Sequence, residues 1–174
     1  MTSLLRRGGV LWKTLAGSGA PASVQRGGAH LLPAYAALAR YHLSTTDLEP
    51  RLRLMVTQLA AERSRCRWCI ERGRHLWREA QLSMDALRAL LCYETSSLFS
   101  NRERAALRFT DAVTRYSEAD GAAGMLAPLT AARQHLSEPE IAAVTAAVAA
   151  THFFNPITGA LGADAEAPWG SFWL

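Results

Sequence analysis

The 174-residue sequence has no apolar run long enough to cross a bilayer, and it has only three cysteines. Even its alanine-rich stretch at residues 141–150 is shorter than the ~18 consecutive apolar residues of a membrane-spanning helix. Three cysteines are too few for the disulfide framework of a small extracellular domain. We therefore expect a soluble, cytoplasmic protein with no membrane partner.

Acidic residues are missing from the first 46 positions, which hold five of the 19 basic residues and none of the 15 acidic ones. The remaining chain is nearly neutral, whereas nucleic-acid-binding domains cluster positive charge on one face or helix. Lys13 interrupts the apolar stretch at residues 8–16, so this lead is a poor match to a secretory peptide. We expect no nucleic-acid partner.

The sequence also lacks the strict apolar–polar alternation and β-branched content that indicate strands. Apolar residues recur instead at helical spacing, for example at Leu52, Met55, Val56 and Leu59. We expect an all-α domain of about six to eight helices. The expected boundaries are a basic lead and loop at residues 1–29, the helical domain at residues 30–163 and an aromatic tail at residues 164–174.

Three capping boxes, in which a serine or threonine precedes a glutamate by three residues, predict where helices begin. These boxes start at Thr46, Ser100 and Ser137 and predict helices through about residues 62, 116 and 153. Ser83 predicts a further helix start. Pro156 is expected to end or kink the last helix, because proline has no backbone N–H to donate.

Other segments complete the predicted order of elements. Residues 33–41, 84–93 and 125–135 are expected to be helical, whereas the Gly-, Ala- and Ser-rich residues 17–28 are expected to form a loop after a short leading helix.

Two of the cysteines, Cys66 and Cys69, form a C-x-x-C motif surrounded by arginines. Thiols at this spacing can form a redox disulfide, and cationic neighbours or a helix N-terminus stabilise the reactive thiolate. The alternative is that both are small, inert core residues. A zinc site needs about four ligands, and no second Cys/His pair at suitable spacing is present, so we expect no metal.

Glu62 and His75 are the nearby candidates for proton transfer. Glu62 precedes Cys66 by four residues, and His75 follows Cys69 by six. One continuous helix over residues 62–69 gives Glu62 and both cysteines a common face, whereas a break at Ser64 removes it. Cys92 lies in an apolar setting that predicts a buried, inert thiol.

Three segments in order resemble the AhpD-like (alkylhydroperoxidase D / carboxymuconolactone decarboxylase) family. They are residues 48–59 with the turn at Cys66 and Cys69, residues 98–107, and residues 136–141. The resemblance covers residues 32 to 163, about three quarters of the chain. It implies an all-α fold assembled as a homo-oligomer, a trimer or hexamer, whose catalytic members reduce hydroperoxides without haem, flavin or metal.

The resemblance also implies catalytic roles and partners. It makes Cys69 the attacking thiol and Cys66 the resolving one, whereas the helix dipole alone favours Cys66 as the more acidic thiol. The implied reaction is that of a thiol-dependent peroxidase or disulfide oxidoreductase with no cofactor. Its partners are an organic hydroperoxide or disulfide substrate and a thiol reductant.

Two positions depart from the catalytic pattern of the resembled family. Its histidine, four residues after the second cysteine, is Gly73 here, and its carboxylate, twelve residues before the first cysteine, is Leu54. Glu62 and His75 then have to supply proton transfer from other positions. One alternative is a non-catalytic helical oligomer with a degenerate site. Another is a decarboxylase-like enzyme, although that branch typically lacks the cysteine pair.

Overall fold

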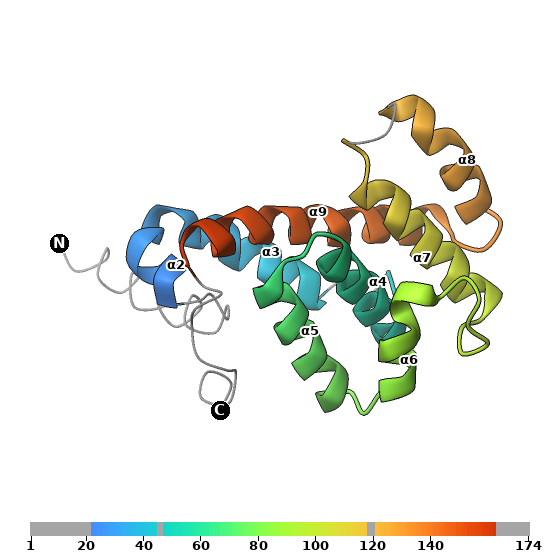
Figure 1. Ribbon diagram of the computed structural model, residues 1–174. Helices are drawn as coiled ribbons and strands as arrows, with labels where there is room; N and C mark the ends of the chain where they lie inside the picture. Colours follow the sequence, from blue (N-terminus) through green and yellow to red (C-terminus); the bar gives the residue numbers. More distant parts are fainter. Residues whose placement is uncertain (1–21, 45–46, 118–120, 163–174) are drawn as a thin grey trace. The chain divides into compact units, whose positions relative to one another are not determined.

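The computed structural model describes residues 22–44, 47–117 and 121–162 (Figure 1). These residues form eight α-helices and two short 3-10 helices with no strand, which confirms the all-α prediction. The elements are α2 (Ala22–Gly27), η1 (Ala29–Leu31), α3 (Leu32–Ser44), α4 (Pro50–Arg63), α5 (Arg67–Glu79), α6 (Met84–Ala89), η2 (Leu90–Cys92), α7 (Asn101–Thr114), α8 (Ala122–Ala132) and α9 (Glu138–Ala160). The expected leading helix and the aromatic tail at residues 164–174 lie outside the described residues.

The described residues divide into two compact units. Residues 22–44 and 156–162 belong to one unit, and residues 47–155 belong to the other. The first unit buries Val24, Leu32 and Tyr35. The second contains both cysteines of the motif and the large hydrophobic core. The domain expected at residues 30–163 spans parts of both units, and its boundaries stay a prediction.

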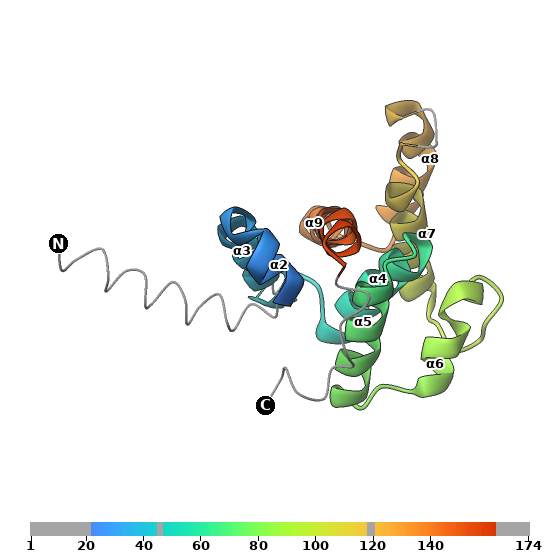
Figure 2. The ribbon, with the colours of Figure 1, turned by 60° about the vertical axis from the view of Figure 1, so that its left-hand side comes forward.

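Helix α4 supplies the centre of the core in the larger unit. Its residues Leu52, Met55, Val56 and Leu59 are all fully buried, as their helical spacing predicts. The helix packs against both α5 and α7 (Figure 2). Trp77 of α5 is fully buried in the same cluster, and its indole N–H donates to the carbonyl oxygen of Ser83 over 3.0 Å. The core therefore fixes α5, which carries the cysteine motif at its N-terminus.

Serine side chains begin two helices as predicted. Ser100 and Glu103 form a complete capping box at α7, and the Ser83 hydroxyl accepts from the backbone N–H of Ala86 at α6. At α9, the Glu140 carboxylate accepts both the backbone N–H and the hydroxyl of Ser137, so the glutamate half of that predicted box is present.

Two local predictions were wrong, and Pro156 does not end the last helix. Helix α4 begins at Pro50 with Glu49 as its N-cap and no side-chain cap, so no capping box starts it; Thr46 itself lies outside the described residues. Residues 22–27, expected in a loop, form α2. Helix α9 runs on to Ala160 with Pro156 inside it. The missing backbone donor costs α9 one hydrogen bond, which the rest of the 23-residue helix outweighs. A kink at Pro156 stays a prediction.

Helix α9 is long and apolar enough to cross a membrane by length and composition alone. Within its most apolar 18-residue window, however, 44% of the residues are buried in the protein. Its residues Ile141, Val144 and Val148 are buried in the larger unit. This burial is typical of a core helix of a soluble protein.

Candidate functional site

The C-x-x-C motif lies where α4 ends and α5 begins. Helix α4 ends at Arg63, and Arg65 adopts a left-handed conformation with φ of 54°. Cys66 is the N-cap of α5. The continuous helix over residues 62–69 is therefore absent, and Glu62 shares no helical face with the cysteines.

Cys66 and Cys69 are joined by a disulfide across the first turn of α5, with their Cα atoms 5.2 Å apart. The backbone N–H of Cys69 donates to the Cys66 sulfur over 3.2 Å, so this sulfur acts as the side-chain cap of the helix. Cys66 is only 2% exposed, whereas Cys69 is partly exposed. The helix N-terminus thus favours a negative charge on the Cys66 sulfur, while solvent has access to Cys69.

A partly buried ion pair holds the turn that precedes Cys66. The Arg63 guanidinium donates to both carboxylate oxygens of Asp111, over 2.7 and 3.2 Å, and the Tyr93 hydroxyl donates to the same carboxylate over 3.0 Å. The hydrogen bond with Asp111 raises the pKa of Arg63. Burial, followed by the negative charge of Asp111, raises the pKa of Tyr93, so the hydroxyl stays protonated as a donor.

Asn155 supports the same turn from α9. Its side-chain amide donates to the carbonyl oxygen of Ser64 over 3.0 Å. Sequence reasoning missed Asn155, Asp111 and Tyr93 as supports of the motif. The available signal was Asp111, a carboxylate among the apolar positions of α7, because such a group is normally paired when buried.

Salt bridges and stacking engage several of the arginines near the motif. Arg74 pairs with Glu62 over 3.3 Å and with Glu71 over 3.0 Å. The guanidinium of Arg72 lies over the ring of Trp68, 5.6 Å from its centroid, and Trp68 is buried. The positive charge that the sequence places around the cysteines is therefore partly used in structural contacts.

The two predicted proton-transfer residues have partners in the structure. The Glu62 carboxylate accepts from Gln58 over 3.0 Å and from Arg74, and His75 lies 3.2 Å from a carboxylate oxygen of Glu79. His75 follows Cys69 by six residues on α5, so the two side chains leave the helix about 120° apart. Their roles in proton transfer stay a prediction.

Gly73, at the position of the resembled family's histidine, lies against a buried glutamine. A Cβ atom added at Gly73 would lie 1.8 Å from the Oε1 atom of Gln58, and Gln58 is 1% exposed. The amide of Gln58 therefore fills the space into which a side chain at position 73 would project. Leu54, at the family's carboxylate position, packs against the hydrophobic core.

Cys92 corrects a further prediction. It is a free, exposed cysteine rather than a buried one. It lies at the end of η2, where only Leu90 of the three residues is buried. Among the described residues, no group of three or more His, Cys, Asp or Glu side chains could hold a metal ion.

The fold has known counterparts, although no family model and no curated protein matches the sequence. One is an Agrobacterium tumefaciens protein of unknown function, ATU0492, proposed to be the antioxidant defence protein AhpD. It is 26% identical, with a TM-score of 0.67 over 76% of this chain and 87% of that chain.

The debrominase Bmp8 shares the fold at lower identity. Its apo structure has a TM-score of 0.73 at 15% identity, covering 99% of this chain and 91% of that one. A cysteine-to-alanine variant of Bmp8 in complex with 2,3,4-tribromopyrrole has a TM-score of 0.76 at 16% identity, covering 96% and 89%. The helical fold and the likeness to the Agrobacterium protein support the resemblance to the AhpD-like family that the ordered motifs indicate.

Proposed function

We propose that this protein is a thiol-dependent peroxidase or disulfide oxidoreductase that works through Cys66 and Cys69 without a cofactor. The observation that carries the proposal is the pairing of the two sulfurs at the N-terminus of α5, with Cys69 open to solvent. Two inert core cysteines need neither a shared disulfide nor solvent access. The likeness to a proposed antioxidant protein supports the same chemistry.

The proposed reaction starts with the Cys69 thiolate attacking one oxygen of a hydroperoxide. A sulfur–oxygen bond forms, the oxygen–oxygen bond breaks and the alcohol leaves with a proton, so that Cys69 becomes a sulfenic acid. The Cys66 sulfur then attacks the Cys69 sulfur, the disulfide forms and water leaves. Two molecules of a thiol reductant return the pair to the dithiol and become a disulfide themselves.

The structure supports a division of labour between the sulfurs. Cys69 is the more exposed, so a peroxide meets it first, in agreement with the attacking role that the family resemblance gives it. Cys66 caps the helix, where the backbone dipoles stabilise a thiolate ready to resolve the sulfenic acid. Glu62 and His75 are the proposed proton carriers, acting through solvent because Gly73 and Leu54 replace the direct relay.

A second candidate is a non-catalytic scaffold with the same fold. The observation that favours it is the Gln58 amide occupying the space beside Gly73, which leaves no room for the family's histidine. In that case the disulfide stabilises the start of α5 and does not turn over. Assembly as a homo-oligomer and a cytoplasmic location belong to both candidates and are part of the proposal.

The test compares single cysteine variants of the reduced protein treated with cumene hydroperoxide. We expect the natural protein to lose two thiols per hydroperoxide consumed. Cys66→Ser should accumulate a sulfenic acid at Cys69, which dimedone traps. Cys69→Ser should no longer react with the hydroperoxide. Cys92→Ser is the matched control, because it removes an exposed cysteine that lies outside the pair. If Cys69→Ser is oxidised at the rate of the natural protein, Cys69 is not the attacking thiol. If the thiols of the natural protein react neither with the peroxide nor with an oxidised thiol, the result favours the non-catalytic scaffold.

The likeness to a debrominase adds one substrate to the same assay. A dithiol can replace a carbon–bromine bond by a carbon–hydrogen bond, releasing bromide and a proton as the pair becomes a disulfide. Bromide release from tribromopyrrole by the reduced protein, lost in Cys69→Ser, assigns this reaction to the pair. Hydroperoxide consumption without bromide release keeps the peroxidase proposal.

A further inference from the structure

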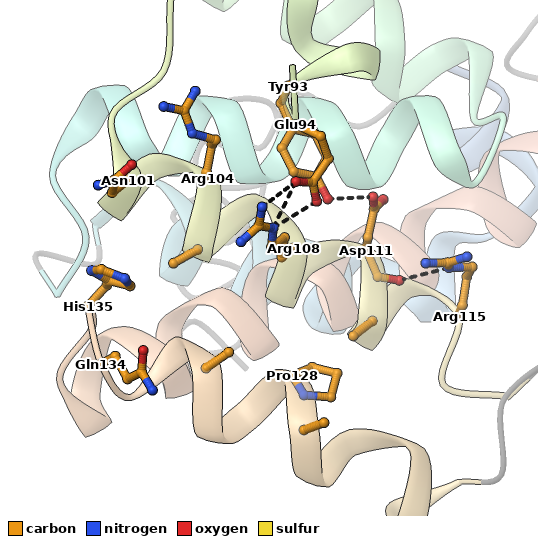
Figure 3. A pocket seen from close by; sticks show the side chains of 14 residues that line it. Tyr93, Glu94, Asn101, Arg104, Arg108, Asp111, Arg115, Pro128, Gln134 and His135 are labelled. Carbon is orange, nitrogen blue, oxygen red and sulfur yellow. Dashed lines mark hydrogen bonds and ion pairs between the residues drawn. The ribbon is translucent and has the colours of Figure 1, made fainter. Parts of the chain in front are cut away.

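A cavity of about 520 Å³ lies between α7 and α8 in the larger unit, and the dithiol does not line it. Its walls come from α7, from α8 and from Tyr93 and Glu94, which precede α7 (Figure 3). The volume falls within the range of about 300 to 1,000 Å³ that is typical of small-molecule sites. The size alone permits a ligand, and the side chains indicate its chemistry.

Three arginines line the cavity from one face of α7. Arg104, Arg108 and Arg115 are four and seven residues apart, so they leave the helix within about 40° of one another. Glu94 neutralises Arg108 by accepting from its Nε atom with both carboxylate oxygens, over 2.8 and 2.9 Å. This hydrogen bond from Arg108 lowers the pKa of Glu94, so the pair stays charged.

Neither of the other two arginines forms an ion pair with a carboxylate within the described part of the chain, although the charge of Arg104 also helps to lower the pKa of Glu94. Arg104 donates to the carbonyl oxygen of Ser96 over 2.6 Å, and Arg115 donates to the backbone oxygen of Asp111 over 3.4 Å. The Asp111 side chain is occupied by Arg63 and Tyr93. The cavity therefore carries an excess of positive charge, and Arg115 has guanidinium N–H groups left to donate.

The wall opposite the arginines is made of short side chains, which leave the cavity open. Helix α8 lines it with Ala127, Pro128 and Ala131, which are too short to fill the space beside the arginine row. Ala105 and Ala112 of α7 add further apolar surface. An occupant therefore meets charge at one side and apolar surface at the other, as Figure 3 shows for the arginines and Pro128.

We infer that this cavity binds a small organic acid, with its carboxylate on Arg115 and its apolar body against the alanines and proline of α8. Arg104 lies eleven residues earlier, about 16 Å along the helix, too far to hold the same carboxylate. Guanidinium groups recognise carboxylates through two parallel N–H bonds. The apolar wall selects against small, strongly hydrated inorganic anions. The binding function is independent of the thiol chemistry, so the proposed peroxidase reaction can fail without affecting it.

The test is calorimetric titration of the full chain with benzoate, with benzamide as the neutral isostere and inorganic phosphate as the purely charged probe. We expect saturable binding of benzoate, with benzamide and phosphate each at least about tenfold weaker, because one lacks the charge and the other the apolar body. Arg115→Gln should weaken benzoate binding by at least about tenfold, whereas Arg104→Gln, about 16 Å away along the helix, should change it by less than about threefold. Ala131→Leu should abolish binding by filling the cavity.

Arg133→Gln is the matched control, because Arg133 lies just beyond α8, pairs with Glu138 and does not line the cavity. It should bind benzoate as the natural protein does, and circular dichroism should show that every variant keeps its helical content. Equal binding of benzoate and benzamide, tighter binding of phosphate, or natural affinity in Arg115→Gln overturns the inference. Absence of saturable benzoate binding to the natural protein overturns it as well.

Discussion

Replacing Gly73 by alanine tests whether Gln58 sets the packing between α4 and α5. The new Cβ atom would lie 1.8 Å from Oε1 of Gln58, far inside van der Waals contact. Gln58 is 1% exposed, so its amide has to move within the core rather than out into solvent. That movement breaks the 3.0 Å hydrogen bond from its Nε2 atom to the Glu62 carboxylate.

The magnitude follows from two opposing effects. A hydrogen bond to a charged acceptor contributes about 1.5 to 3 kcal/mol, and glycine-to-alanine replacement inside a helix returns about 0.5 to 1 kcal/mol. Gly73→Ala should therefore lower the free energy of unfolding by about 1 to 2 kcal/mol. In a Gln58→Ala background the clash is gone, so the same replacement should stabilise the protein by about 0.5 to 1 kcal/mol.

Urea denaturation of the four proteins of this double-mutant cycle measures both effects. Gly159→Ala is the control, because among the described residues nothing lies within 4 Å of a Cβ at that helical position. It should be neutral or stabilising. The reasoning is refuted if Gly73→Ala is as stable as the natural protein. It is also refuted if the replacement changes the free energy of unfolding equally with and without Gln58.

Three further predictions concern stability. Ser100→Ala should cost about 1 kcal/mol in thermal or urea unfolding, because it removes the side-chain half of the capping box with Glu103; no loss shows that the box is not needed. Asp111→Asn should lower the free energy of unfolding in urea by about 1 to 3 kcal/mol, because Arg63 loses a charged partner. The partial exposure of Arg63 keeps this loss below that of a fully buried ion pair. The pKa of Glu140 is lowered from 4.5, first by the backbone N–H of Ser137, so its stabilisation is complete above pH 4.5 and is lost as the pH falls through the lower folded value. Melting temperatures measured from pH 6 to about pH 3 should therefore fall less steeply for Glu140→Gln, and an unchanged slope contradicts this assignment.

Local sequence signals predicted the helical fold where one interaction decides the structure. The Ser100 box and the Ser83 cap begin helices as expected, because each hydroxyl meets a nearby backbone donor. Pro156 does not end α9, because a single missing donor is outweighed by the rest of the helix. Such a balance depends on packing that the local sequence does not show.

The candidate site was predictable only in part, for a similar reason. The spacing of Cys66 and Cys69 places their sulfurs on one turn, and the structure joins them. The arginines misled in part, because charge near the motif in sequence includes Arg63, which pairs with Asp111 from a different helix. Gln58 was missed although it is a polar residue on the buried face of α4. A buried polar residue of this kind indicates a specific partner across the core.

The unequal exposure of the two sulfurs also determines how an oxidised pair is reopened. In the proposed reaction, we expect an incoming thiol to reach the partly exposed Cys69 first, to form the mixed disulfide there and to release Cys66 as the leaving group. The negative charge of the Cys66 thiolate then lies at the N-terminus of α5, where the backbone dipoles stabilise it. If the proposed function holds, we expect a protein reductant to dock over the Cys69 side of α5.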